Sequence, residues 1–429
     1  MKKEKTISFD PPATFLDGLT YDDAVEAAGK NAVSVEIWLL QHMLILLGSP
    51  AVAVKLWNGD KIWVCDKEPT ITALIRNRNA LYKLLANPNL YFGDLYSAGQ
   101  IEVEGDLLQF LEISYTAMLR TEHNAGPIKK RITEFLTRAP RANTLAGSRT
   151  HIDHHYDIGN EFYTLWLDRD HMQYTCAYYP DEAMTLQQAQ TAKLEHICRK
   201  LELKPGETVV EAGCGWGGLA RYMAKHYDVK VKSYNISHEQ VIFARQRAKD
   251  QGLDGKVEYI EDDYRNITGE FDAFVSIGML EHVGHNNYSK LGEVIHRCLK
   301  PEGRGFIHSI GRNEPALMNA WIEKRIFPGA YPPALREMMD IFEPSNFSVQ
   351  DVENLGRHYA RTLEHWLQRY DENIEQVEAM FDKAFVRAWR LYLVGSIAAF
   401  NTGELQLFQI LFTRPQNNPL SYSRAHLYQ

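Results

Sequence analysis

A run of twelve residues, Glu207 to Gly218, has the residue types and spacing of a nucleotide-binding loop. It reads ETVVEAGCGWGG, with an acid, Glu211, at the end of a short apolar strand and four glycines after it. Because glycine has no Cβ atom, backbone N–H groups of such a loop can approach a ligand closely. The helix expected to begin near Leu219 adds unpaired N–H donors at its N-terminus. The stretch therefore predicts a site for a nucleotide-like cofactor.

Two cofactors fit a loop of this kind. Gly213, Gly215 and Gly218 have the spacing of NAD sites, but NAD also requires an acid about 20 residues further on, at the end of the next strand. That strand, 229–234, is followed by Asn235, Ile236 and Ser237, none of which is an acid. Glu211 instead suits S-adenosylmethionine (SAM), which carries an ammonium group and a cationic sulfonium. A glycine turn with a purely structural role is the third alternative, and the acid beside four glycines favours cofactor binding over it.

The length and composition of the chain set its number of domains and argue against several classes of protein. The 429 residues are enough for two or three domains of about 100 to 200 residues each. A formal net charge of −8 argues against nucleic acid as the main partner, since phosphate binding rests on clustered Lys and Arg. Five cysteines without a C-x-x-C pair indicate neither a disulfide framework nor a zinc site, and suit a reducing cytoplasm. The most apolar run, 37–47, is too short to span a bilayer.

Strands and helices alternate from residue 193 onward, which is typical of a parallel, doubly wound α/β sheet. The expected strands are 208–212, 229–234, 257–261, 271–277 and 305–310, with helices at 239–251 and 288–299. Two helices, 358–370 and 374–400, and a last strand, 405–413, follow a proline-rich stretch. Ligands of such sheets lie at the carboxyl ends of the strands. We therefore expect the residues at those ends to form one cleft: Glu211, Asn235, Asp262, Asp263, 277–282 and 308–310.

The first 120 residues predict a separate, small α/β domain. Its expected elements are a helix over 21–48, a hairpin over 51–64, a helix over 70–87 and a strand followed by a helix within 95–110. This pattern resembles the sterol-carrier type of lipid-binding domain. The segment 121–150 is strongly basic, with Lys129, Lys130 and four arginines against two acids. We interpret it as a linker whose charges are either a solvated face or a contact for anionic lipid headgroups.

Eight motifs in the rest of the chain resemble the cyclopropane-fatty-acid synthase and mycolic acid cyclopropane synthase family. They run in order from about His151: HHYDIGNEFYTLWLD, MQYTCAYY, AQTAKLEHICRKL, EAGCGWGGLA, NISHEQ, SIGMLEHVG, HSIG and NLGRHYARTLEHW. The family usually has Asp at Glu211 and often Ser at Thr175. The resemblance implies a class I SAM-dependent methyltransferase fold over 151–429: a doubly wound, mostly parallel, Rossmann-like sheet of seven strands, beside the smaller N-terminal α/β domain (1–120) and the basic linker (121–150).

The resemblance also implies an activity, the transfer of a methylene group from SAM to the cis double bond of an unsaturated acyl chain in a membrane phospholipid. A carbocation formed on the way would be quenched by water, so the site must be dry and yet contain a base. In this family the base is thought to be a bound bicarbonate. Its implied ligands are the backbone of Cys176 and Ile310 and the side chains of Glu281, His308 and Tyr359.

The cofactor contacts implied by the family fall into groups along the SAM molecule. Tyr174 and Thr175 would lie at the methionine end, with Glu211, Gly213 and Gly215 at the loop. The ribose and adenine would be contacted by Asn235, Ile236, Gln240, Asp263, Tyr264 and Ile277. Four of the bicarbonate ligands also have a structural explanation when taken singly: a Glu281–His282 pair, a core His308, a packing Tyr359 or a small buried Cys176. Their joint occurrence favours function.

Two other functions remain as alternatives. The same scaffold could stop at methyl transfer, which would give a methyl-branched lipid or an N-methylated small molecule. A non-enzymatic lipid carrier built on the first domain is the other, and the intact glycine loop argues against it. The expected partners are an unsaturated phospholipid and, transiently, the membrane surface of a cytoplasmic enzyme. The apolar helix around Trp38 to Leu47 is a candidate for acyl contact or for a homodimer interface, or is only the core of its own domain.

Overall fold

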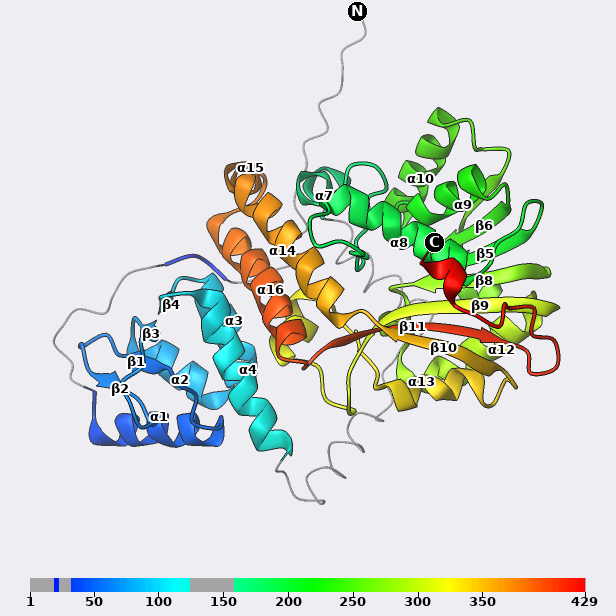
Figure 1. The fold of residues 1–429 in the computed structure, drawn as a ribbon. Helices are drawn as coiled ribbons and strands as arrows, with labels where there is room; N and C mark the ends of the chain where they lie inside the picture. The colour runs from blue at the N-terminus through cyan, green and yellow to red at the C-terminus, as the bar shows by residue number, and fades with distance from the viewer. Residues whose placement is uncertain (1–18, 23–31, 124–157, 429) are drawn as a thin grey trace, which may run out of the picture.

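The computed structural model describes residues 19–22, 32–123 and 158–428 and contains two separate sheets (Figure 1). The larger has seven strands and the smaller has four. Nearly all of the expected basic linker lies outside the described residues, as do His154 to Asp157 of the first family motif.

The seven-stranded sheet confirms the expected doubly wound architecture. Its strand order is β10-β11-β9-β8-β5-β6-β7, in which β5 to β9 run parallel and β11 runs antiparallel to both of its neighbours, β9 and β10. The strands are β5 (Thr208–Ala212), β6 (Lys230–Asn235), β7 (Val257–Glu261), β8 (Phe271–Ile277), β9 (Leu299–Gly311), β10 (Ser348–Asn354) and β11 (Gln406–Thr413). Strand β10 was not predicted from the sequence. This edge strand has no fully buried residue and reads SVQDVEN, so it lacks the apolar run typical of the inner strands.

Helices cover both faces of this sheet, and some of them lie between it and the smaller, four-stranded sheet (Figure 1). They are α7 (Asn160–Trp166), α8 (Leu186–Lys200), α9 (Gly218–His226), α10 (His238–Asp250), α11 (Leu280–Val283), α12 (Tyr288–Cys298), α13 (Leu335–Phe342), α14 (Gly356–Glu372), α15 (Ile374–Met380) and α16 (Lys383–Asn401). The single helix expected over 374–400 was wrong. The helix is interrupted at Asp382, whose backbone is extended and whose side chain caps α16 by accepting the N–H of Phe385 at 2.7 Å.

The smaller sheet has the order β2-β1-β3-β4 and is covered by four helices. Its elements are α1 (Ser34–Leu46), β1 (Ala53–Lys55), β2 (Lys61–Ile62), β3 (Thr72–Ile75), α2 (Arg78–Ala86), α3 (Pro88–Ser97), β4 (Ile101–Glu104) and α4 (Leu107–His123). The hairpin is confirmed. The helix expected over 70–87 was wrong in its first half, because Thr72–Ile75 pairs with β1 and β4 as a central strand. Asn77 then caps α2 by accepting the N–H of Ala80.

The helices α3 and α4 pack on α16, which lies beside α14 between the two sheets (Figure 1). A buried, bidentate ion pair joins Asp94 of α3 to Arg325, with N–O distances of 3.0 and 2.9 Å. Gly93 lies under the ring of Trp321, so close that a Cβ atom would be 2.4 Å from it. The small sheet is therefore docked on the helical layer rather than directly on the large sheet.

Candidate active site

The four glycines after β5 have two different roles. A Cβ atom at Gly217 would lie 2.5 Å from the hydroxyl of Tyr259, and one at Gly218 would lie 2.4 Å from the carbonyl of His171. These two positions are glycine because the chain packs tightly there. Gly215 has a positive φ of 50° and nothing within 4 Å of a Cβ atom placed on it. It is the loop position open to a ligand.

Two other segments meet the glycine loop, as the strand-end argument predicts. The loop after β8 packs on it through Met279, whose Cβ would lie 3.1 Å from a Cβ on Gly213. Thr175 packs on the same loop, since its Cγ2 would lie 2.9 Å from a Cβ on Gly278. The structure thus brings Thr175 and the end of β8 at Ile277 together with the glycine loop, on the side assigned to the methionine end.

Helix α8 holds Thr175 in place with two buried side chains. Gln190 Nε2 donates to the Thr175 carbonyl at 2.8 Å, and Lys193 Nζ donates to its hydroxyl at 3.0 Å. Neither residue was predicted from the sequence to have a role. The sequence nevertheless contained a signal for them. Gln190 and Lys193 lie three residues apart on the apolar, inward-facing stripe of α8, where a polar side chain requires a partner.

Glu211 lies behind the loop rather than on its surface. Its side chain is 2 % exposed and accepts a hydrogen bond from the hydroxyl of Ser233 on β6. Burial raises the pKa of this carboxyl to about 7, against the opposing effects of the Ser233 hydrogen bond and the charges of Lys193 and Arg221. Its charge state is therefore sensitive to pH near neutrality.

The residues expected at the ribose form one hydrogen-bonded group. Asn235 Nδ2 donates to Gln240 Oε1 at 2.9 Å and to the carbonyl of Gly215 at 3.3 Å. Gln240 is buried, and its Nε2 has no partner among the described residues. Ile236, which lies between these two residues in the sequence, is half-buried. A free amide donor thus lies beside the open part of the glycine loop.

The residues expected around adenine lie at separate strand ends. Asp263 follows β7, and its carboxylate is already bound by Arg265, whose Nε and Nη2 donate at 2.7 and 2.8 Å. The guanidinium of Arg265 also lies 5.5 Å from the ring centre of Tyr264. Ile277 ends β8, which β5 and β6 separate from β7. The carboxylate of Asp263 is therefore positioned by Arg265, and only a ligand that spans several strands could contact both ends.

A second cluster forms where β9 ends. Glu281 of α11 is buried, and its Oε1 accepts the backbone N–H of Ile310 at 2.6 Å. Its Oε2 is buried without a partner among the described residues. Burial raises the pKa of Glu281 to about 7, although the hydrogen bonds around it lower it.

His308 belongs to the same strand end. Its Nδ1 lies 3.2 Å from Nε2 of Gln409 on β11, and because an amide nitrogen can only donate, we assign the ring proton to Nε2. That Nε2 is buried and unpaired within the described ranges. Burial, helped by the charges of Lys193 and Lys200, holds the pKa of His308 well below its usual value. The cluster therefore offers a free carboxylate oxygen and a free imidazole N–H.

Cys176 and Tyr359 reach this cluster through Leu355, which precedes α14. The Leu355 carbonyl accepts the N–H of Tyr359 at 3.1 Å and lies 3.8 Å from the Cys176 sulfur. The Leu355 N–H donates to Leu407, which is paired with Ile310 across β11 and β9. Cys176 is fully buried, and burial raises the pKa of its thiol. All five expected ligand positions are thus linked within one region.

Aromatic side chains surround the region. The hydroxyls of Tyr174 and Tyr392 lie 2.9 Å apart, and the Tyr174 ring contacts Trp366, as does the Tyr359 ring. Phe400 packs on Tyr359 with ring centres 4.7 Å apart. Most of these rings are buried, and the arrangement suits chemistry that must exclude water.

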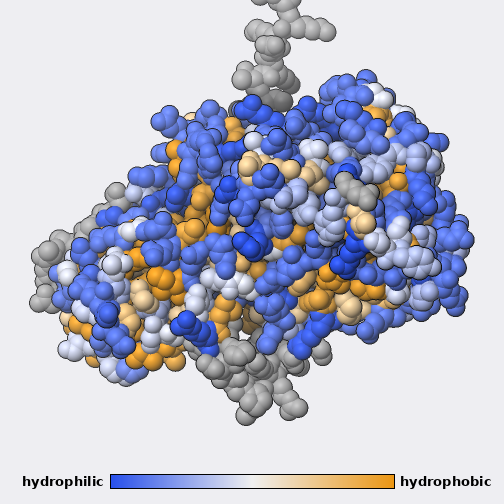
Figure 2. All heavy atoms as spheres, in the orientation of Figure 1, coloured by the Kyte–Doolittle hydropathy of each residue, from blue (hydrophilic) through white to orange (hydrophobic). Residues whose placement is uncertain are grey.

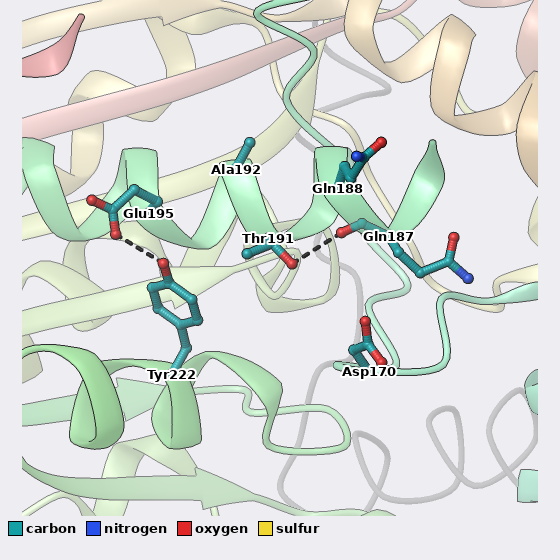
Figure 3. A pocket seen from close by; sticks show the side chains of 7 residues that line it. All are labelled: Asp170, Gln187, Gln188, Thr191, Ala192, Glu195 and Tyr222. Atoms are coloured by element: carbon teal, nitrogen blue, oxygen red, sulfur yellow. Dashed lines mark hydrogen bonds between the residues drawn. The ribbon is translucent and has the colours of Figure 1, made fainter. Parts of the chain in front are cut away.

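A surface groove of about 410 Å³ lies elsewhere, between α8 and α9 (Figure 3). It is lined by Asp170, Gln187, Gln188, Thr191, Ala192, Glu195 and Tyr222. Glu195 accepts the hydroxyl of Tyr222 at 2.8 Å across it. The groove lies on the outer face of α8, away from Thr175, and is separate from the strand-end site. No group of three potential metal ligands occurs within the described ranges.

Comparison with known proteins gives two family matches. The model of the mycolic acid cyclopropane synthetase family matches residues 144–410, which is more than half of the chain. A family described only as a domain of unknown function matches residues 39–125, so the likeness of this part to sterol carriers stays a prediction.

Individual relatives agree with the first match. The chain is 37% identical to the cyclopropane-fatty-acyl-phospholipid synthase of Escherichia coli K12 over 82% of this chain and 90% of that protein. It is 34% identical to a probable fatty acid methyltransferase of Pseudomonas putida, over 88% and 96% of the two chains. The crystal structure of mycolic acid cyclopropane synthase CmaA1 with SAH and CTAB is similar with a TM-score of 0.59 and 28% identity, over 62% of this chain and 97% of CmaA1.

Proposed function

The chain belongs to the mycolic acid cyclopropane synthetase family of SAM-dependent enzymes, and from that premise we propose that it forms cyclopropane rings on acyl chains of membrane phospholipids. The methylene comes from SAM and is added to a cis double bond. The match to the E. coli synthase over most of both chains supports this substrate class. The observation that carries the proposal is the buried Glu281 carboxylate, which uses one oxygen on the Ile310 N–H and leaves the other free in an aromatic, dry region.

The residues of the glycine loop and its neighbours fit the cofactor. Gly215 is open, Gln240 has a free amide donor beside it, and α8 holds Thr175 against Gly278, in the loop after β8 that packs on the glycine loop. The SAH complex of CmaA1 supports SAM as the ligand. When bound, SAM supplies a methyl group activated by a positive sulfonium. We assign the methionine end to Tyr174, Thr175 and the loop, the ribose to Asn235, Ile236 and Gln240, and adenine to Asp263, Tyr264 and Ile277.

We assign the base to a bicarbonate ion, which the residues at the end of β9 would hold. Its hydroxyl would donate to the free Oε2 of Glu281, and its oxygens would accept the N–H of His308. Cys176, Ile310 and Tyr359 complete the set. The Ile310 N–H is already donated to Glu281, and bicarbonate has a single O–H, so Ile310 would contribute to the site by orienting the Glu281 carboxylate. When bound there, bicarbonate would supply the base for the proton that must leave the added methyl group on ring closure.

The decisive experiment uses purified protein, labelled SAM and vesicles of unsaturated phospholipid. Ring formation gives a cyclopropane carbon signal in the product, whereas a methyl-branched chain or an N-methylated amine gives a methyl signal of equal mass gain. Absence of SAM or SAH binding in calorimetry would refute the proposal and favour a lipid carrier. The bicarbonate assignment is tested separately, because a rate unchanged by added bicarbonate after thorough carbonate removal would contradict it.

Access to the membrane is assigned to the N-terminal part of the chain. Helix α1 buries Leu40 and Leu44 against its own sheet, but its other face is exposed: Trp38 is 54 % and Leu46 is 77 % exposed. Figure 2 shows hydrophobic side chains along the lower left edge of the molecule, where Figure 1 places α1. Six of the twelve large exposed hydrophobic side chains of the described residues lie between Val33 and Leu46. No helix in the described ranges has the length and hydropathy to cross a bilayer.

A face of this kind suits shallow contact with the lipid interface, and residues 1–120 serve as the membrane-contact domain. Replacing Trp38 and Leu46 by Ser should reduce co-flotation with vesicles while the oligomeric state in sedimentation stays the same. Ile242→Ser, on α10 and 48 % exposed, is the matched control. If the double variant instead dissociates a dimer and still binds vesicles, the face is a subunit interface.

A further inference from the structure

Helix α8 buries two lysines, Lys193 and Lys200. They lie seven residues apart and therefore on the same inward face of the helix. Lys193 has no exposed surface and Lys200 is 2 % exposed. A buried ammonium group is costly unless an opposite charge or a full set of hydrogen bonds compensates it.

The two lysines differ in their partners. Lys200 Nζ lies 2.6 Å from the carboxylate of Glu353 and 3.6 Å from that of Asp351, so its charge is balanced within the chain. Lys193 Nζ donates only to neutral oxygens, those of Gln173 and Thr175. Within the described ranges, no carboxylate lies within 4 Å of it.

The nearest acids are occupied elsewhere. Asp168 accepts the N–H groups of His171 and Gln173 at 2.8 and 2.6 Å. Glu211 accepts the hydroxyl of Ser233. Both attract the charge of Lys193 from a distance, while Cys176, His171 and His308 are the other titratable groups that this charge influences. Burial lowers the pKa of Lys193 to about 8, so at pH 7 it remains mainly protonated.

The position of this ammonium group is next to the proposed cofactor site. It is one hydrogen bond behind Thr175, and Thr175 packs on Gly278 in the loop that contacts Gly213. An ammonium group has three N–H donors, and the chain provides two acceptors. The missing negative charge and the remaining donor both point to an anionic ligand at the same place.

We propose that Lys193 is a positioning residue that balances a carboxylate-type anion bound beside Thr175. This inference rests on the proposed function, which supplies two such anions: the methionine carboxylate of SAM and the bicarbonate ion. The charge acts over a short distance in a water-free region, where it is little screened. Lys193 therefore makes cofactor binding depend on the charge of the site, although it takes no part in the reaction itself.

The test measures calorimetric affinity for SAH and for its decarboxylated form, S-adenosyl-3-thiopropylamine, in carbonate-free buffer. The variants are Lys193→Met, Lys193→Arg and the control Lys200→Met, each checked for folding by circular dichroism. If the anion is the methionine carboxylate, Lys193→Met should weaken SAH binding roughly 10- to 100-fold and leave the decarboxylated form within about threefold, as expected for loss of a charge-assisted contact. Lys193→Arg should recover much of the loss.

If the anion is bicarbonate, the SAH affinity of Lys193→Met should be unchanged and the dependence of the rate on bicarbonate should shift to higher concentration. A folded Lys193→Met protein with wild-type SAH affinity and wild-type bicarbonate dependence would overturn the inference. Should the variant not fold, the wild type decides alone: equal affinity for SAH and its decarboxylated form, with no response to bicarbonate, overturns it as well. A wild type that binds no SAH refutes the proposed function instead.

Discussion

Replacing Glu281 by Gln separates the catalytic role of this residue from its effect on stability. The substitution keeps the shape and the oxygen that accepts the Ile310 N–H at 2.6 Å, but it removes the charge. It also replaces the free Oε2 by an NH₂ group, which cannot accept a hydrogen bond. The variant should therefore fold normally and bind the anion poorly.

The magnitudes follow from the burial of the carboxyl. Loss of a hydrogen bond to a charged group corresponds to about 2 to 3 kcal/mol, or roughly a hundredfold lower kcat/KM. The stability should change in the opposite direction. The pKa is raised from its ordinary 4.5 to about 7, so ionisation of the buried group costs about 3 kcal/mol at most. The folded state binds more protons than the unfolded state between these values, so Glu281 lowers stability as the pH rises from about 4.5 to 7.

We expect Glu281→Gln to have a higher melting temperature than the wild type at pH 8 and a similar one at pH 4.5. The assays are thermal unfolding without ligand at both pH values, SAH calorimetry and initial rates on vesicles. Glu337→Gln is the control, since Glu337 is equally buried but caps α13 and accepts the hydroxyl of Tyr331 at 3.0 Å. A Glu281→Gln protein with kcat/KM within about threefold of wild type would refute the assigned role.

Four other changes give distinct outcomes. Gly215→Val should abolish SAH binding in calorimetry, whereas Gly206→Val, also at a positive φ with open space, should leave it intact; equal affinities would refute the loop assignment. His308→Ala should lower kcat/KM roughly a hundredfold with unchanged SAH affinity, because it removes the free N–H of the anion site. Asp94→Asn should destabilise the protein by about 3 kcal/mol or more in thermal unfolding by leaving Arg325 buried and unpaired, and Asp371→Asn, at the exposed Arg390 pair, should change little; similar effects would contradict a special role for the docking pair. Lys129→Glu with Lys130→Glu should weaken binding to anionic vesicles mainly at low salt, and salt-independent binding would exclude the basic segment as a lipid contact.

The sequence predicted the large sheet well because its inner strands are short apolar runs and the connections between them are strongly patterned. The glycine loop was identified from local spacing, and the structure places it between β5 and α9 as expected. Local patterns failed where tertiary pairing overrode them: Thr72–Ile75 looked like part of a helix but is a central strand, and the half-exposed β10 gave no signal.

The sequence by itself determined the family, the fold class and the types of residue available for chemistry. Only the tertiary structure decided how those residues are paired: that Gly217 and Gly218 are packing positions while Gly215 is open, that Glu281 binds Ile310, and that Lys193 lacks the acid partner that Lys200 has. The physical reason is that spacing along a chain fixes which face of an element a side chain occupies. Its charge partner and its burial depend on elements that are distant in sequence, and these exist only once the sheet and its helices have packed.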